Sequence, residues 1–328
     1  MRVLLLQLDG KLPNLALMRI AAHHRARGDE VEFRHAANIS ALERKLWEFP
    51  EQIYASLIFE KTRPLAEHLQ FLYPSAIIGG TGWDVRLKLE DVGITTTEVD
   101  YSIYPHFKHS IGFTQRGCRL RCSFCVVPNK EGAIKEVSTV ADIWRGEPYP
   151  RNLLLLDNDF FGQPHWQARI EEIRAGNFKA CFSQGINARM LNDETAAAIA
   201  SIQYYDDQFK TRRIYTAWDN QKDEQRLFNG LNALVEHGVK PDHIMVFMLI
   251  GYWRGETAAD RDYRRARLRA FGCRPYPMPY VRTPELVGFQ RWVVGAYDKR
   301  ISWERWQSAK YQPSNLGRDV GQLSLIEQ

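Results

Sequence analysis

Short apolar runs alternate with stretches of helical periodicity through about the first hundred residues. Between the first two runs, Leu15, Met18 and Ala22 recur at a spacing that places them on one helix face, and Gly28 follows as a helix C-cap. The apolar runs predict four strands, over residues 3–6, 30–33, 53–59 and 76–79. Short strands separated by helices are typical of a parallel sheet covered by helices. We therefore expect a Rossmann-like first domain over residues 1–104.

The same alternation resumes after a connecting segment rich in aromatic residues. Six further strands are predicted, over residues 109–114, 152–156, 180–183, 213–217, 244–249 and 274–277. Helical patterns over 192–201, 221–237 and 256–271 separate the later strands. Six strand–helix units are too few to close an eight-stranded barrel, so residues 105–285 should form a partial (β/α)6 barrel of the TIM type. Residues 286–328 should form a helical C-terminal extension with a mobile tail.

The composition is that of a globular α/β chain with two domains. The chain has 328 residues, of which 45% are hydrophobic and 25% charged, and these values exclude a disordered or collagen-like protein. The net charge of +5 is only mildly basic and identifies no partner. No stretch approaches the roughly 20 apolar residues of a membrane-spanning helix, and the apolar start is too short for a signal sequence. We expect a cytoplasmic protein.

The cysteines carry the most informative pattern. Three of the five cysteines, Cys118, Cys122 and Cys125, fall within eight residues just after the first predicted strand of the second domain. This C-x3-C-x2-C spacing favours a metal site in a reducing compartment over a disulfide framework. Three thiolates on one loop can hold three corners of a [4Fe–4S] cluster and leave the fourth iron open. A zinc site is the alternative, with His106 or His109 as the fourth ligand.

The cysteine spacing, with Phe124 before the last cysteine, resembles the radical S-adenosylmethionine (radical SAM) superfamily. The resemblance extends over the second domain, because the family's partial barrel also carries its cysteine loop after the first strand. It implies an enzyme in which a [4Fe–4S] cluster on the three cysteines binds S-adenosylmethionine (SAM). An electron donor such as flavodoxin or ferredoxin would then supply the electron that cleaves SAM. The resulting 5′-deoxyadenosyl radical would abstract hydrogen from the substrate, while the protein orients the reactants.

The resemblance also implies further site residues at the strand ends. The family often has Gly-Gly-Glu after its second strand, whereas this chain has an acidic stretch without glycines, as in members with a cobalamin-binding-like N-terminal domain. The residues expected to bind SAM are Phe124, Asp157, Asn158, Gln184, Arg189, Asp219 and Gly251. The residues expected to contact the substrate are Asp159, Trp218, Tyr252 and Tyr280.

The first domain resembles the cobalamin-binding domain that precedes many radical SAM barrels. Members that hold cobalt through histidine carry Asp-x-His-x-x-Gly after the first strand, but the turn from Asp9 to Pro13 has no histidine. His23 and His24 lie inside the first predicted helix, where a solvated or packed role explains them. The glycine-rich turn over 79–82 is a tight strand-ending turn or a place where a ligand's phosphate approaches. We expect a domain that does not bind cobalamin.

The substrate is predicted less sharply than the chemistry. The helix over 256–271 carries five arginines and is either a phosphate-binding surface or a solvated outer helix. We expect a nucleobase or nucleic acid as substrate. The alternatives are a peptide or small metabolite, including cobalamin-dependent methylation, or a non-catalytic iron–sulfur or zinc protein that binds nucleic acid. Residues 322–326 resemble the short peptide with which bacterial DNA enzymes bind the sliding clamp, although Ile326 replaces the usual aromatic residue.

Overall fold

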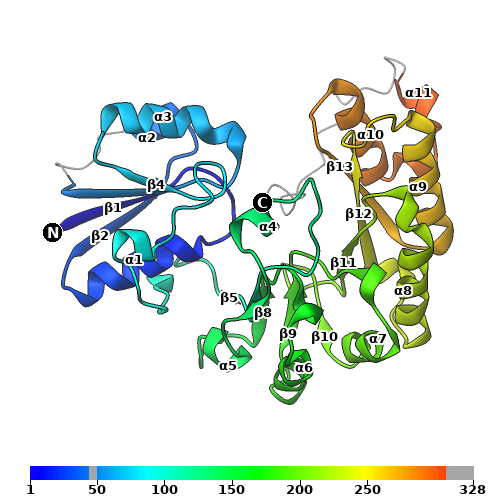
Figure 1. Ribbon diagram of the computed structural model, residues 1–328, viewed down its shortest axis with the longest axis horizontal. Coiled ribbons are helices and arrows are strands. Elements are labelled where there is room, and N and C mark those ends of the chain that lie inside the picture. Colours follow the sequence, from blue (N-terminus) through cyan, green and yellow to red (C-terminus); the bar gives the residue numbers. More distant parts are fainter. Residues whose placement is uncertain (44–49, 308–328) are drawn as a thin grey trace. The chain divides into compact units, whose positions relative to one another are not determined.

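The computed structural model describes residues 1–43 and 50–307, which fold as two compact units (Figure 1). Within the described residues, the first unit comprises Met1–Lys108 and Val126–Gly132, and the second comprises His109–Cys125 and the chain from Ala133 onward. Each unit is a mixed α/β structure built on parallel strands. No helix in the described ranges has the length and apolar character needed to cross a membrane.

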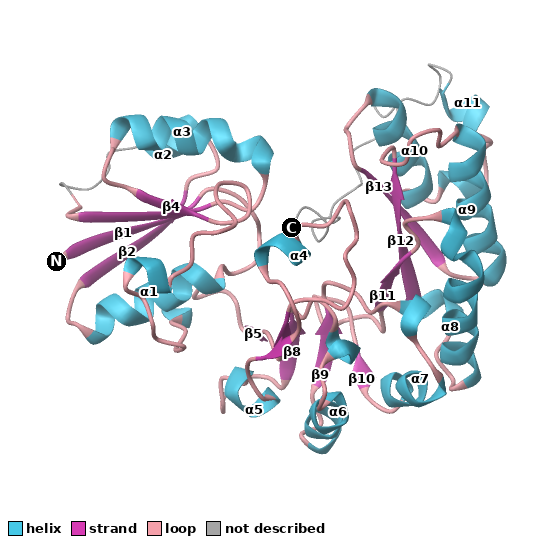
Figure 2. Ribbon diagram, viewed as in Figure 1, coloured by secondary structure: helices cyan, strands magenta, loops and turns pink. Residues whose placement is uncertain are grey.

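The first unit is built on one four-stranded parallel sheet, in the order β2-β1-β3-β4 (Figure 2). Its strands are β1 (Arg2–Gln7), β2 (Glu30–His35), β3 (Gln52–Ser56) and β4 (Ile77–Gly79). Its helices are α1 (Leu15–Ala26), α2 (Ile39–Glu43) and α3 (Arg63–Leu72), with α4 (Val127–Lys130) in the returning segment. All four predicted strands are confirmed. The third ends earlier than predicted because the Asp9 carboxylate accepts the N–H groups of Ile58 and Phe59 at 2.7 and 2.9 Å.

The two faces of this sheet bury different helices. Leu4 and Leu6 belong to a core that includes residues of α3, whereas Val3 and Leu5 belong to a second core that includes residues of α1. Because successive side chains of a strand point to opposite faces, a continuous apolar run is the sequence pattern of a strand covered on both sides. Figure 1 shows α1 on one side of the sheet and α2 and α3 on the other.

The second unit contains two parallel sheets. One has the order β10-β9-β8-β5 and the other has the order β11-β12-β13. The strands are β5 (Ser110–Gly112), β8 (Asn152–Leu155), β9 (Lys179–Phe182), β10 (Gln203–Tyr204), β11 (Ile214–Ala217), β12 (Ile244–Ile250) and β13 (Arg274–Pro279). A small antiparallel hairpin joins β6 (Gln115–Arg116) to β7 (Lys135–Glu136). The six predicted strands are confirmed, but β6, β7 and β10 were not predicted, since two residues carry no periodic signal.

Helices cover the outer faces of these sheets. They are α5 (Val140–Ile143), α6 (Trp166–Ala175), α7 (Asp193–Ala200), α8 (Glu224–Glu236), α9 (Ala258–Phe271), α10 (Pro284–Val294) and α11 (Trp303–Gln307). Alternate residues of β12 enter the shared core, and on the other face Phe247 stacks on Tyr215 with ring centroids 5.6 Å apart. The prolines at alternate positions of β13 are tolerated because β13 lies at a sheet edge. The helices α10 and α11 fall in or near the predicted C-terminal extension, and the proposed clamp-binding peptide lies outside the described residues.

Candidate functional site

The three clustered cysteines lie on one loop of the second unit, which we define as residues 117–125 and call the cysteine loop. It follows β6 and begins at Gly117, whose φ of +85° favours glycine. None of the three cysteines forms a disulfide, and all three are partly buried. The backbone N–H of Leu120 donates to the Cys118 sulfur at 3.3 Å, and the N–H of Cys125 donates to the carbonyl of Cys122 at 3.0 Å. The loop therefore carries three accessible sulfur ligands on an ordered backbone.

The root of the loop is held by a buried carboxylate at the end of β8. Asp157 is 3% exposed and accepts the N–H groups of Thr114 and Gln115 at 2.6 and 2.7 Å. The Thr114 hydroxyl adds a third hydrogen bond at 2.9 Å, and Gln163 donates to that hydroxyl at 3.0 Å. Burial raises the pKa of Asp157 to about 7, although these hydrogen bonds oppose the shift. This carboxyl group therefore fixes the segment that enters the cysteine loop.

The next two residues continue this attachment, and we call Asp157, Asn158 and Asp159 together the strand-end clamp. The Asn158 side-chain oxygen accepts the N–H of Gly117 at 3.1 Å. The Asp159 carboxylate accepts the N–H of Arg119 at 3.1 Å and pairs with its guanidinium at 2.8 and 3.0 Å. This ion pair raises the pKa of Arg119. The strand-end clamp thus orients the first half of the cysteine loop through both backbone and side chain.

The contacts of the strand-end clamp can be compared with the roles predicted for its three residues. Asp157 and Asn158 were predicted to receive the amino group of SAM, and Asp159 was predicted to contact the substrate. In the structure all three side chains bind the chain itself, within residues 114–119. Positioning the cysteine loop is therefore their observed role, and ligand binding by them stays a prediction.

The electrostatics of the thiols show that they lie near one another. Burial raises the pKa of the Cys118 thiol, and the Asp159 carboxylate, Cys122 and Cys125 raise it further. Among the described residues, no three His, Cys, Asp or Glu side chains are grouped as the ligands of a single metal ion. Each thiolate of an iron–sulfur cluster binds a different iron atom, whereas a single ion draws its ligands to one point. Three cysteines on one loop, none of them in a disulfide, are therefore the kind of donor set that a cluster needs.

Arg189, which follows β9, approaches the cysteine loop from another strand. Its guanidinium pairs with Asp223 at 2.6 Å and donates to the Asn187 side chain at 3.1 Å. Burial lowers the pKa of Arg189, but Asp223 and the Cys122 thiol outweigh burial and the net shift is upward. Arg189, which was predicted to bind SAM, therefore lies next to Cys122 and has a carboxylate partner that the sequence did not indicate.

Aromatic residues from the ends of β12 and β13 contact the cysteine loop on another side. The Tyr252 hydroxyl donates to Ser123 at 2.9 Å, and its ring meets Phe124 edge to face at 5.5 Å between centroids. Trp253 also contacts Phe124, and Tyr280 meets Tyr252 at 4.7 Å between centroids. Phe124, Tyr252 and Tyr280 were predicted separately, and the structure brings them together beside the thiols.

Other predicted residues are placed differently. Trp218 is 0% exposed and packs on Phe228 in the core, and its contact with the substrate stays a prediction. The Gly251 N–H donates to Glu256 at 2.6 Å, and a Cβ at Gly251 would lie 2.4 Å from Leu286, so packing accounts for the glycine. Burial raises the pKa of Asp219 to about 6, with Arg189 and Arg264 opposing. Gln184 is exposed at the end of β9.

The arginines of α9 form ion pairs within the chain. Arg264 is 2% exposed, binds Glu256 and donates to the carbonyl of Trp218 at 2.8 Å. The other four also have acidic partners: Arg261 pairs with Glu285, Arg265 with Asp262 and Asp298, Arg267 with Glu224, and Arg269 with Asp298. The sequence left two interpretations of this helix open, a phosphate-binding surface and a solvated outer helix. The structure favours neither of them. These arginines fasten α9 to its neighbours.

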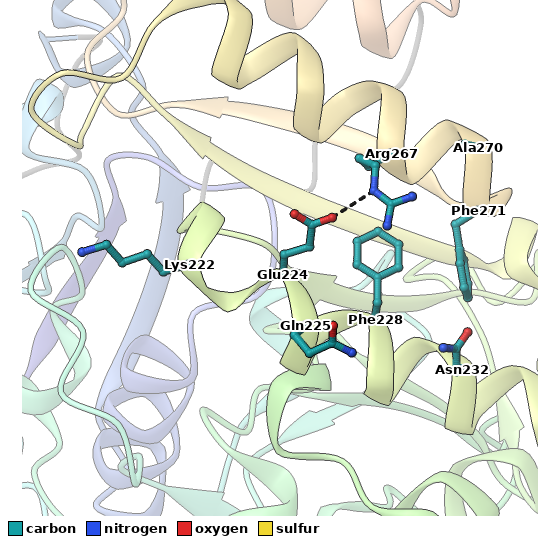
Figure 3. Close-up of a pocket in the computed structure, with 8 residues that line it drawn as sticks. All are labelled: Lys222, Glu224, Gln225, Phe228, Asn232, Arg267, Ala270 and Phe271. Carbon is teal, nitrogen blue, oxygen red and sulfur yellow. Dashed lines mark hydrogen bonds and ion pairs between the residues drawn. The ribbon is translucent and has the colours of Figure 1, made fainter.

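A surface pocket of about 660 Å³ lies between α8 and α9 (Figure 3). Phe228, Arg267 and Phe271 line it, and the Arg267 guanidinium lies over the Phe228 ring at 4.8 Å. No residue of the cysteine loop lines this pocket. It is therefore separate from the residues that the sequence singled out.

Sequence reasoning missed the residues that hold the site together. These are Thr114, Gln115, Arg119, Ser123, Asp223 and Trp253. Their position beside a motif or at a strand end was visible, but their partners lie 34 to 129 residues away in the chain. No protein-family model matches this chain, and no curated protein is significantly similar to it.

The buried carboxyl group of Asp157 makes the stability of the second unit depend on pH. With a pKa of about 7 in the folded chain and about 3.9 unfolded, Asp157 binds a proton on folding between those values, so its contribution to stability falls as pH rises through 7. When the pH is lowered from 8 to 6, we expect the free energy of unfolding of the wild-type chain to rise by about 1 kcal/mol relative to that of Asp157→Asn. Urea unfolding at the two pH values measures this difference.

The Asn variant is the matched control because its amide copies the protonated acid. Its oxygen can still accept the two N–H groups, so we expect a folded chain. Asp157→Ala leaves both buried donors unpaired and should lose about 3 kcal/mol at either pH. Identical pH profiles for the wild type and Asp157→Asn would contradict the assignment.

Proposed function

We propose that this protein is a radical SAM enzyme whose [4Fe–4S] cluster is held by Cys118, Cys122 and Cys125. The observation that carries the proposal is the cysteine loop: three partly buried cysteines, none of them in a disulfide, lie on one segment at the carboxyl ends of parallel strands. A strand-end clamp fixes that segment, and Arg189 supplies a cation next to Cys122. In α/β folds with parallel strands, functional groups gather at this edge.

The fold supports the same proposal at a finer level. We propose that the second unit is a partial (β/α)6 barrel, in which β5, β8, β9, β11, β12 and β13 are the six barrel strands. The first unit is then a Rossmann-like domain of the cobalamin-binding-like kind. Supporting features are the parallel order of the strands in each sheet and the outer layer of helices.

The roles of the chain's own residues follow from their contacts. A bound cluster would supply the single electron that cleaves SAM. Cys118, Cys122 and Cys125 would hold it, and the N–H of Leu120 already donates to one of these sulfurs, which stabilises thiolate charge. Arg189 can pair with a carboxylate of SAM in exchange for Asp223. Phe124, Tyr252 and Trp253 keep an apolar wall beside the loop and limit water there.

The cluster gives the first test of the proposal. Protein purified without oxygen should be brown and contain about four iron and four sulfide per chain. Cys122→Ala should lose the colour and most of the iron, because a loop ligand is gone. Cys181→Ala is the matched control, since Cys181 is 0% exposed inside β9 and should leave the cluster intact. A colourless protein with one zinc would instead favour a structural zinc site.

Cleavage of SAM gives the second test. With a strong reductant, the protein should release 5′-deoxyadenosine even without substrate. Arg189→Ala should weaken SAM binding by about 10- to 100-fold, because a charge-assisted ion pair is lost. Asp223→Asn separates the roles of the pair: it keeps the guanidinium and should leave SAM affinity unchanged or increased. Equal losses in both variants would show that Arg189 only supports the fold.

We propose further that the first unit does not bind cobalamin, because the described turns do not fit the cofactor. A Cβ at Gly80 would lie 2.1 Å from the carbonyl oxygen of Leu57, and one at Gly82 would lie 2.6 Å from the backbone of Phe59, so close backbone packing accounts for both glycines. The buried Gln7 amide donates to the carbonyls of the first turn, between 2.9 and 3.2 Å. Backbone packing thus explains the glycines of one turn, and the Gln7 amide occupies the carbonyls of the other.

Reconstitution with hydroxocobalamin followed by desalting tests this part of the proposal. We expect no corrin absorbance to remain with the protein, since the turn after β1 has no histidine and its polar groups are already hydrogen-bonded. Stoichiometric retention would contradict it and would favour radical methylation as the reaction.

A further inference from the structure

Three exposed cations surround the cysteine loop, and we call Arg121, Lys222 and Arg254 the rim cations. Each comes from a different segment: Arg121 from the loop itself, Lys222 from the turn after β11 and Arg254 from the turn after β12. All three side chains are exposed. None has a hydrogen bond or ion pair from its side chain to another residue in the described parts of the chain. They therefore differ from the paired arginines of α9.

The neighbours of the rim cations fix them around the thiols. Arg121 precedes Cys122. Lys222 precedes Asp223, whose partner Arg189 interacts with Cys122. Lys222 also lines the α8–α9 pocket, where its side chain extends away from Arg267 (Figure 3).

The third rim cation is fixed in the same way on the aromatic side of the loop. Arg254 follows Trp253, whose ring contacts Phe124 at 6.3 Å between centroids. The indole of Trp253 also donates to the carbonyl of Asp219 at 2.6 Å, which ties this turn to the end of β11. Contacts within the second unit thus place all three rim cations beside the same loop.

The acidic groups at this edge do not neutralise the rim cations. Asp159 pairs with Arg119, and Asp223 pairs with Arg189. Glu256 is 6% exposed at its side chain and pairs with Arg264. Asp157 accepts three hydrogen bonds and is buried, and the Asp219 carboxyl interacts electrostatically with Arg189 and Arg264. The uncompensated charge at the carboxyl ends of these strands is therefore positive, which favours an anionic ligand.

An exposed aromatic surface lies within this positive rim. Tyr280 is 54% exposed, and its contact with Tyr252 is edge to face, so one ring leaves the face of the other accessible. Exposed tyrosine rings stack on nucleobases, and cations spaced around them contact the phosphates on either side. Exposed tyrosine rings together with surrounding cations therefore suit a ligand that carries both a nucleobase and a phosphate.

We propose that the substrate is a phosphate-bearing nucleobase, bound with its base on Tyr252 and Tyr280 and its phosphates on the rim cations. The proposal rests on the proposed function, because it takes the cysteine loop as the reaction centre. Three cations on three segments favour a single-stranded polynucleotide, which presents several phosphates, over a free nucleotide. The arginines of α9 contribute nothing to this binding, since they are already paired.

Binding of a fluorescent single-stranded oligonucleotide of about 20 nucleotides, measured by anisotropy across a salt series, tests the proposal. The triple variant Arg121→Gln, Lys222→Gln, Arg254→Gln should bind about 100-fold more weakly near 0.1 M salt. The slope of log Kd against log salt should fall by about 2, as expected for three lost contacts with single-strand phosphates. Unlabelled mononucleotides added as competitors identify the source: displacement at similar concentrations means a free nucleotide, and no displacement means a strand.

A charge-matched control separates the rim from the net charge. The triple variant Lys210→Gln, Arg226→Gln, Lys240→Gln removes three exposed cations that precede β11, lie on α8 or precede β12. It should bind within about threefold of the wild type. Equal losses in both triple variants, or no binding of either ligand by the wild type, would overturn the proposal. The assay needs neither SAM nor reductant, so failed binding with intact SAM cleavage refutes only the substrate class, and the reverse refutes only the proposed function.

Discussion

The structure of the candidate site depends on one buried carboxyl group. Asp157 is 3% exposed and accepts three hydrogen bonds from Thr114 and Gln115, so it joins the end of β8 to the start of the cysteine loop. Burying a charge is costly unless donors compensate it, and the pKa of about 7 shows that the compensation is incomplete. The burial of Asp157 therefore costs free energy, but its hydrogen bonds fix the conformation of the segment that enters the cysteine loop. Without that attachment, three thiols on a flexible segment would have to be ordered by their ligand alone.

The strands were predictable because burial on both faces leaves a signal that survives without tertiary information. Leu4 and Leu6 face one core and Val3 and Leu5 another, and the sequence shows this as an unbroken apolar run. The end of β3 was not predictable. Asp9 takes the N–H groups of Ile58 and Phe59, and a carboxylate 49 residues away leaves no trace in the local pattern. Periodicity therefore locates elements, while distant hydrogen bonds decide where they end.

In the candidate site, too, local patterns predicted where residues lie, whereas distant contacts determine what those residues bind. The cysteine spacing located the loop, and strand ends located Arg189 and Tyr252 near it. The roles of the individual residues were harder to predict than their positions. An acidic residue at a strand end can face a ligand or bind the chain's own backbone, and the local sequence is the same in both cases. Trp218 illustrates this: its strand-end position suggested a pocket wall, but packing against Phe228 buries it completely. Partners such as Asp223, 34 residues from Arg189, become known only when the chain is folded.

The pairing of basic with acidic side chains also determines which surfaces of the protein carry an uncompensated charge. The chain has 44 basic and 39 acidic residues, so composition alone gives a weak field. An ion pair is a local dipole whose field falls quickly with distance, so the matched arginines of α9 contribute little beyond their own surface. The field of an unmatched cation such as Arg121 or Arg254 is not cancelled by a partner and decays by screening over a length of about 10 Å at 0.1 M salt. The arginine-rich α9 therefore adds little to the long-range field of the protein, and the rim cations are the groups that we propose attract an anionic ligand to the cysteine loop.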